Sequence, residues 1–256
     1  MKFSRRELIT TAIKGALVTA LPMSAFRILS PAEAEASIKE ANVRWGFIVN
    51  THKCVGCGFC VKACKLENEV PYDVAVTRTW VERYVILKDG RTLIDTPNAG
   101  RDGFTEQSIQ GRDVNPKDIS KAYFVPKLCN QCENPPCVQV CPVGATYQTP
   151  DGVVLVDRKW CIGCGYCIMS CPYGARFFHP VHRVAEKCTF CYHRIVKGMK
   201  SACVQACPFG ARLIGNLKDP NDPVTKTVLN ERVAVLKDAF GTKPQVYYVG
   251  LDENVR

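Results

Sequence analysis

Cysteine constrains the fold of this chain more than any other residue type. The sequence has 16 cysteines among 256 residues, and it is far longer than the small secreted domains that use cysteines as disulfide staples. The cysteines fall into four quartets with none left over, so we expect them to be ligands. The quartets, numbered in chain order, are Cys54, Cys57, Cys60 and Cys64; Cys129, Cys132, Cys137 and Cys141; Cys161, Cys164, Cys167 and Cys171; and Cys188, Cys191, Cys203 and Cys207.

The spacing within the quartets is typical of iron–sulfur binding. The third quartet reads C-x2-C-x2-C-x3-C-P, which is the 4Fe–4S run of bacterial ferredoxins. The second and fourth quartets have longer gaps before the third cysteine, and three quartets end in CPVGA, CPYGA and CPFGA. Zinc and disulfides are the alternatives. Zinc sites need only two C-x2-C pairs, not a third cysteine and a fourth followed by proline. The spacing predicts four 4Fe–4S clusters.

The same spacing predicts which cysteines share a cluster. Three cysteines that are close in sequence surround one cluster, and glycines such as Gly56 and Gly163 let backbone amides approach the sulfurs. The fourth cysteine is expected to start or lie on a short helix and to bind a neighbouring cluster. We expect this exchange between quartets two and three and between quartets one and four; pairing one with two is the less economical alternative. The expected ligand sets are Cys54, Cys57, Cys60 and Cys207; Cys188, Cys191, Cys203 and Cys64; Cys129, Cys132, Cys137 and Cys171; and Cys161, Cys164, Cys167 and Cys141.

The basic residues are explained by the clusters. The net charge is +10, which taken alone would suggest nucleic acid or an anionic membrane surface. Each oxidised 4Fe–4S cluster with its four thiolates is a dianion, so four of them offset most of that charge, and no nucleic acid is expected as a partner. A lysine precedes the first cysteine of each quartet by one or two residues, where positive charge stabilises an anionic cluster and raises its potential. These are Lys53, Lys127, Lys159 and Lys187.

Residues 1–36 have the features of an export signal. The 12-residue apolar run between Lys14 and Arg27 is too short to span a bilayer, and small-x-small cleavage patterns follow at 32–36. The pair Arg5-Arg6 resembles a twin-arginine signal, which exports folded, cofactor-loaded proteins and so spares sixteen thiols from scrambling in an oxidising compartment. Leu8 and Thr10 depart from the usual pattern, and an ordinary secretory leader is the alternative. We predict export to the periplasm by the twin-arginine route; removal of the leader and its retention as an anchor both stay open.

The expected fold is α+β, with two ferredoxin-like cluster-binding units. Quartets two and three form the inner unit, and quartets one and four form the outer unit. The insertion between quartets one and two is expected to contain a β-hairpin, with a strand at Thr79–Leu87 and a surface loop at 98–118. The tail after Cys207 is expected to end in a strand at Gln245–Val249 and either to clamp the outer unit or to meet a partner. The predicted divisions are 129–187 for the inner unit, 37–64 and 188–256 for the outer unit, and 65–128 for the insertion.

The remaining candidate residues suggest no catalysis. The four histidines are not at ligand spacing with any spare cysteine, so we expect them at the surface or in hydrogen bonds, and the three tryptophans are expected in the core. No nucleophile motif, phosphate-binding loop, or flavin or pterin signature is present, which predicts a protein with no catalytic site of its own. The residues concerned are His52, His179, His182, His193, Trp45, Trp80 and Trp160.

From residue 44 to about 250 the sequence resembles the iron–sulfur subunits of periplasmic respiratory oxidoreductases. These are the ferredoxin-like subunits of polysulfide, tetrathionate and dimethyl sulfoxide reductases and of formate-dependent nitrite reduction. The resemblance is carried by CNQCENPPCVQVCP, CTFCYHRIVKGMKSACVQACP, GNLKDPNDP and GTKPQVYYV. Some relatives have Trp in place of one cysteine and a three-iron cluster, whereas every ligand here is cysteine. The resemblance implies four cubanes.

The resemblance also implies partners. Such subunits bridge a polytopic, quinone-reactive membrane subunit and a catalytic subunit that often carries a molybdopterin. The inner pair of clusters faces the membrane, and the outer pair faces the catalytic subunit. We therefore expect an electron-transfer subunit of a periplasmic respiratory complex, held at the membrane by a partner. The alternative is a free-standing periplasmic polyferredoxin that exchanges electrons with soluble redox partners.

Overall fold

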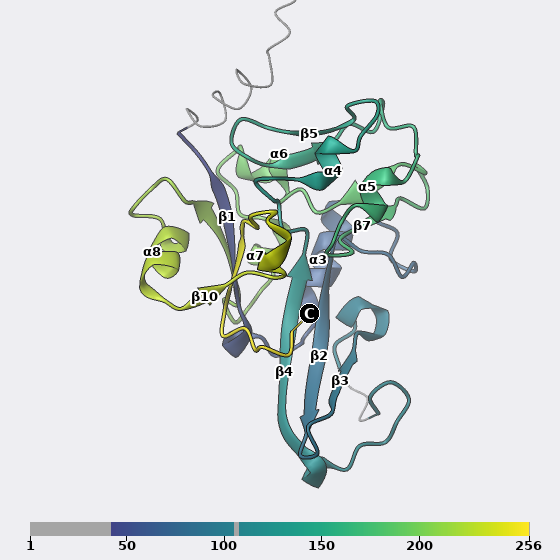
Figure 1. Cartoon of the computed structure of the whole chain (residues 1–256), viewed down its shortest axis with the longest axis vertical. Helices are drawn as coiled ribbons and strands as arrows, with labels where there is room; N and C mark the ends of the chain where they lie inside the picture. The colour runs from purple at the N-terminus through teal and green to yellow at the C-terminus, as the bar shows by residue number, and fades with distance from the viewer. Residues whose placement is uncertain (1–41, 105–107, 256) are drawn as a thin grey trace, which may run out of the picture. The chain divides into compact units, whose positions relative to one another are not determined.

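The computed structural model describes residues 42–104 and 108–255, in which short helices alternate with strands (Figure 1). This mixed content is that of the α+β class. The predicted export signal, residues 1–36, lies outside the described residues.

The largest sheet is organised by strand β1 (Trp45–Asn50), whose apolar centre, Phe47 to Val49, is buried. Strand β1 pairs in parallel with β11 (Val246–Val249) and antiparallel with β9 (Arg212–Asn216). Strand β10 (Val233–Ala234) completes the order β10-β11-β1-β9. The segment that leads into the first quartet is thus hydrogen-bonded to segments that follow the fourth quartet.

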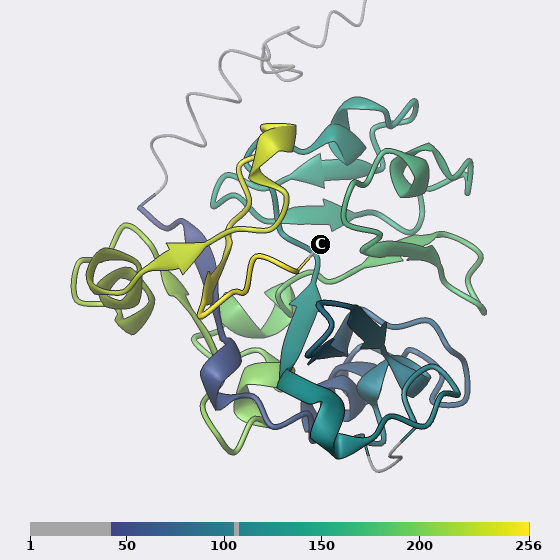
Figure 2. The same ribbon diagram turned by 60° about the horizontal axis from the view of Figure 1, so that its bottom comes forward.

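The insertion forms a second, antiparallel sheet in the order β3-β2-β4. Its strands are β2 (Thr79–Leu87), β3 (Thr92–Asp95) and β4 (Ile119–Leu128). Strands β2 and β4 run side by side in Figure 1, and Figure 2 shows the same sheet foreshortened, with its lower end turned forward. The stacked rings of Tyr84 and Tyr123 join the two strands with centroids 5.3 Å apart. Strand β4 ends at Leu128, so it delivers the polypeptide directly to Cys129.

The second and third quartets are each followed by a small hairpin. Strand β5 (Thr146–Gln148) pairs with β6 (Val154–Val156), and β7 (Arg176–Phe178) pairs with β8 (Ala185–Lys187). Helix α4 (Pro136–Gln139) contacts α5 (Tyr166–Met169) between these hairpins. In the same way α3 (Phe59–Glu67), from the first quartet, contacts α7 (Ala202–Gln205), from the fourth.

The remaining elements are short. Helix α8 (Pro223–Asn230) begins with proline at its first turn, and Asp222 caps it by accepting a hydrogen bond from the Val224 amide at 2.7 Å, a favourable helix start. The others are α6 (Tyr192–Ile195) and the 3₁₀ helices η2 (Thr51–Lys53), η3 (Pro97–Gly100), η4 (Pro116–Asp118) and η5 (Asp238–Phe240).

The main hydrophobic core includes cysteines. Phe47 from β1 stacks on Phe190 with ring centroids 5.4 Å apart, and Cys60, Cys188 and Cys203 lie in the same buried cluster. These three sulfurs therefore belong to the dry interior rather than to a solvated loop, which lowers the local dielectric constant around anything they bind.

Two expectations from the sequence are wrong. The fourth cysteine was expected to start or lie on a short helix, but Cys141, Cys171 and Cys207 each come two residues after a helix ends. In these quartets the third cysteine is helical instead; only Cys64 lies within a helix as expected. Trp160 was expected in the core and is 68% exposed.

Candidate cluster-binding sites

The first quartet lies in a loop that turns tightly around a cavity. Gly56 and Gly58 have φ of +69° and +76°, which a residue with a side chain rarely adopts. A Cβ at Gly58 would lie 2.2 Å from the Arg101 carbonyl oxygen, so only glycine allows the insertion to approach this loop so closely. The cavity is lined by sulfurs from both the first and the fourth quartet: Cys54, Cys57, Cys60 and Cys207.

Cys64 faces a different group of sulfurs. Its thiol is buried, which raises its pKa well above the ordinary value, and it interacts with the thiols of the fourth quartet, Cys188, Cys191 and Cys203. The Asn68 amide joins the two quartets, because its Nδ2 donates to Cys64 Sγ at 3.5 Å and to Cys191 Sγ at 3.9 Å. Asn68 is itself fixed by Arg78, whose Nη1 donates to Asn68 Oδ1 at 2.6 Å.

The second and third quartets also meet. Burial raises the pKa of Cys132 to about 12, and its thiol interacts with Cys129, Cys137 and Cys171. Cys171 belongs to the third quartet, so three sulfurs of one quartet and one of the next lie together. The Cys161 loop is hydrogen-bonded to strand β8, because the Ala185 amide donates to Cys161 Sγ at 3.4 Å.

The CPxGA repeats have a structural role that the sequence reasoning missed. In each repeat the glycine has a positive φ, between +60° and +65°, and turns the backbone so that the next alanine amide hydrogen-bonds back to the cysteine sulfur. Such N–H···S bonds stabilise a thiolate. The pairs are Ala145 with Cys141, Ala175 with Cys171, and Ala211 with Cys207, the last at 3.4 Å.

Buried cations next to the sulfurs show that these sites fit an anionic cofactor. Arg176 and Arg212 are 5% and 1% exposed, and among the described residues the Nη2 atom of each has no hydrogen-bond partner. Burial opposes the charged form of Arg212, yet nearby thiols led by Cys60 and Cys203 raise its pKa. An unpaired buried donor is costly, and the sulfurs of a bound 4Fe–4S cluster would be acceptors for these guanidinium groups.

The four lysines that precede the quartets do not behave alike. Lys187 is fully buried. Lys127 is also buried but pairs with Glu82 at 2.8 Å, so its charge is already matched. Lys53 and Lys159 are exposed, where solvent screens them. Sequence position alone therefore overestimates how much Lys53, Lys127 and Lys159 stabilise an anionic cluster.

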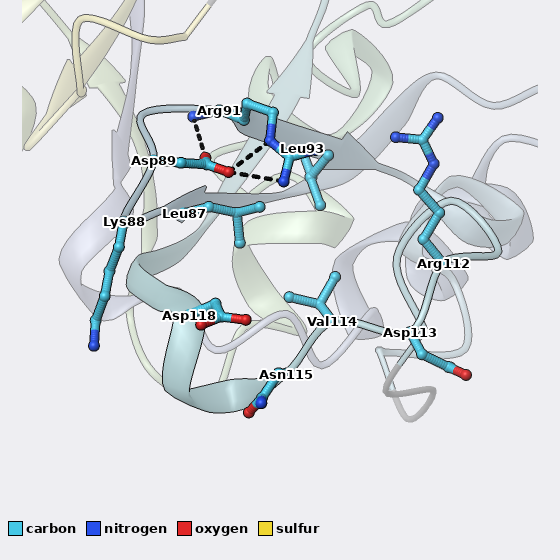
Figure 3. Close-up of a pocket in the computed structure, with 10 residues that line it drawn as sticks. All are labelled: Leu87, Lys88, Asp89, Arg91, Leu93, Arg112, Asp113, Val114, Asn115 and Asp118. Atoms are coloured by element: carbon cyan, nitrogen blue, oxygen red, sulfur yellow. Dashed lines mark hydrogen bonds and ion pairs between the residues drawn. The ribbon is translucent and has the colours of Figure 1, made fainter.

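A hollow of another kind lies at the far end of the insertion sheet (Figure 3). Asp89 and Arg91 form a salt bridge of 2.7 Å across its rim, and Leu87, Leu93 and Val114 lie beneath. No cysteine lines this hollow, and its ion pair is solvent-exposed, so we assign it no part in cofactor binding.

Comparison with known proteins agrees with the cysteine pattern. Two family models match, each described as a 4Fe–4S dicluster domain, one at residues 53–145 and the other at 120–217. Together they cover all four quartets. Two dicluster domains and 16 cysteines account for four 4Fe–4S clusters.

The chain is similar to iron–sulfur subunits over most of its length. A tetrathionate reductase subunit of Salmonella typhimurium is 37% identical over 88% of this chain and 78% of its own length. A tetrathionate reductase subunit of Archaeoglobus fulgidus is 44% identical over 81% of this chain and 83% of its own length. A polysulfide reductase subunit of Wolinella succinogenes is 34% identical over 80% and 94%. The chain therefore belongs to the family of ferredoxin-like 4Fe–4S electron-transfer subunits of respiratory oxidoreductases, as its cysteine motifs predict.

Proposed function

We propose that this chain is the electron-transfer subunit of a periplasmic respiratory complex. It relays electrons between a quinone-reactive membrane subunit and a molybdopterin-type catalytic subunit, and it has no catalytic site of its own. The observation that carries this proposal is the series of interacting thiols that links the first quartet to the fourth, the fourth to the second and the second to the third, with eight of the sixteen cysteines buried. The clusters supply one-electron chemistry when bound; the polypeptide holds them at fixed spacing and excludes water.

The four ligand sets expected from the sequence are part of this proposal, and we number each site by the quartet that supplies its first three cysteines. Site 1 joins the Cys54 loop to Cys207, and site 4 joins the Cys188 loop to Cys64. Site 2 joins the Cys129 loop to Cys171, and site 3 joins the Cys161 loop to Cys141. The cavity shared by Cys207 and the first quartet supports site 1, and the interactions of Cys64 and Cys132 support sites 4 and 2.

The ligand sets imply the division of the chain. Residues 129–187 would form the inner unit, 37–64 and 188–256 the outer unit, and 65–128 the insertion. The contacts of α3 with α7 and of α4 with α5 favour this pairing of quartets one with four and two with three. The matched family models instead follow the linear order of the chain, so pairing of quartets one and two is the competing arrangement.

Iron content tests the cofactor load directly. We expect about sixteen iron and about sixteen acid-labile sulfide per chain after anaerobic purification, because four cubanes each contain four of both. The measurement is colorimetric iron and sulfide analysis against protein determined by amino-acid analysis. A value near twelve iron, or stoichiometric zinc, would contradict four cubanes.

The surface around site 3 supports docking of a partner. Cys164 is the exposed cysteine of the sixteen, and large apolar side chains beside it are open to solvent: Trp160, Ile162, Tyr166 and Met169 are 68%, 65%, 55% and 77% exposed. Exposed apolar patches mark interaction sites. We assign this surface, the site 3 face, to the membrane subunit, as the family resemblance implies.

Charge placed on the site 3 face should release the membrane subunit. We expect Ile162→Glu with Met169→Glu to abolish copurification of the membrane subunit with a tagged catalytic subunit, because both carboxylates would be buried without partners. Iron content and attachment to the catalytic subunit should be unchanged. The matched control is Leu229→Glu on α8, where the side chain is 74% exposed. If the double variant still retained the membrane subunit, this assignment would be refuted.

The runner-up function is a free-standing periplasmic polyferredoxin. It predicts that the native protein purifies alone and that the double variant changes only its reaction with soluble redox partners. Copurification from the native membrane therefore separates the two functions.

Among residues 42–104 and 108–255, no helix has the length and apolar character needed to cross a bilayer. We propose that residues 1–36 direct export by the twin-arginine route and that a partner subunit holds the protein at the membrane.

A further inference from the structure

Three buried cations lie among the cysteines, and no carboxylate of the described residues forms a salt bridge with them. They are Arg212 on β9, Lys187 on β8 and Arg176 on β7. Their exposed fractions are 1%, 0% and 5%. Within the described residues none of the three forms a salt bridge, whereas the buried Arg78 and Lys127 and the half-buried Arg83 each pair with an acid. Burial of an unbalanced charge is costly, so a counter-charge is expected nearby.

Arg212 lies between site 1 and site 4. It lines the cavity that holds the sulfurs of site 1, and its guanidinium interacts with Cys54 and Cys60 of that site and with Cys203 of site 4. Its Nη1 donates to the Thr79 hydroxyl at 3.0 Å, and its Nη2 has no hydrogen-bond partner in the part of the chain that the structure describes. One guanidinium therefore interacts with the ligands of two sites.

Lys187 lies between site 4 and site 2. Its ammonium interacts with Cys129 and Cys137 of site 2 and with Cys188 of site 4. The Nζ atom donates to the carbonyl oxygens of Val154 and Cys188, the latter at 2.9 Å. The side chain is thereby fixed at the junction of the inner and outer units.

Arg176 lies between site 2 and site 3. Its guanidinium interacts with Cys129 and Cys137 of site 2 and with Cys167 of site 3. Its Nη1 is 3.4 Å from the Thr146 hydroxyl, and its Nη2, like that of Arg212, is buried with no hydrogen-bond partner within residues 42–104 and 108–255. Each of the three junctions thus contains one cation.

We propose that Arg212, Lys187 and Arg176 are positioning charges at successive junctions of a single line of clusters in the order 1–4–2–3, and that each raises the reduction potential of the two clusters it separates. The inference rests on the proposed ligand sets. A cation shared by two anionic sites favours the additional electron on either one, and the low dielectric of the interior strengthens the effect. Charges two sites away contribute less, because attraction falls with distance.

The test is a redox titration of the full-length, cluster-loaded protein, followed by electron paramagnetic resonance. Single Cys→Ser changes at Cys54, Cys188, Cys132 and Cys164 first assign the four signals. We expect Arg212→Met to lower the potentials of clusters 1 and 4 together, and Arg176→Met to lower those of clusters 2 and 3. The expected change is at least about tenfold in each one-electron equilibrium, which is about 59 mV. Arg212→Lys and Arg176→Lys keep the charge and should restore most of each shift.

Lys187→Met keeps the length of the side chain and provides an independent case if an arginine variant loses iron. In Lys187→Met the reduction potentials of clusters 4 and 2 must both fall, while the potentials of clusters 1 and 3 change by less than half as much. The matched control is Arg232→Met, an exposed arginine between α8 and β10, which should shift no signal. Shifts confined to one cluster, equal shifts in all four, or no recovery with lysine would overturn the inference. The ligand sets fail separately, when a Cys→Ser change alters a signal outside its assigned site.

Discussion

Replacing Cys207 with serine is expected to alter the cluster held by Cys54, Cys57 and Cys60 and to leave the cluster of the fourth quartet intact. Cys207 lines the cavity of the first quartet, although it is the last cysteine in the sequence. Serine is a poor iron ligand, so the corner iron should be lost and the signal of cluster 1 should become that of a three-iron form or disappear. A redox titration followed by electron paramagnetic resonance reports each cluster at its own potential.

Two further variants make this result decisive. Cys54→Ser must change the same signal as Cys207→Ser, because both ligands belong to site 1. Cys64→Ser is the reciprocal change and must alter the signal that Cys188→Ser alters. If Cys207→Ser instead changed the Cys188→Ser signal and spared the Cys54→Ser signal, each quartet would close on itself. The exchange of cysteines between quartets one and four would then be wrong.

Local patterns in the sequence carried most of the information about elements. The alternating, β-branched segment at Thr79–Leu87 indicated a strand, and β2 has those bounds. The expected final strand at Gln245–Val249 corresponds to β11, which begins one residue later. The alternation of apolar and polar residues in a strand can be recognised from neighbouring residues alone, without knowledge of what the strand packs against. The spacing of cysteines around a cluster can be recognised in the same way.

The residues that the sequence did not reveal depend on distant contacts. Arg212 and Arg176 each directly follow a CPxGA repeat, as CPFGAR and CPYGAR, but the sequence does not show that each interacts with sulfurs of a second quartet. The exposure of Trp160 likewise reflects its place at the edge of the Cys161 loop. By contrast, the CPxGA repeat is visible in the sequence. Glycine readily adopts a positive φ, so a turn that brings the next alanine amide back to the cysteine sulfur could have been predicted.

Changing Arg5 and Arg6 to lysine is expected to keep the precursor in the cytosol with its iron bound. The twin-arginine route recognises the two arginines, whereas an ordinary secretory leader needs only positive charge ahead of its apolar run. The Lys-Lys variant preserves that charge, so it separates the two routes. The measurement is fractionation into cytosol, periplasm and membrane, with iron determined in each fraction that contains the protein.

The control for this variant is Arg27→Lys, which changes an arginine of the same segment outside the pair and should leave export intact. Retention of an iron-loaded Lys-Lys precursor would also fit the physical requirement behind the route, since clusters assembled before export keep sixteen thiols out of reach of an oxidising compartment. If the Lys-Lys protein were exported as well as Arg27→Lys, the export machinery would need only the positive charge of the leader and not its two arginines. The clusters would then have to be assembled after translocation, and the twin-arginine assignment would be wrong.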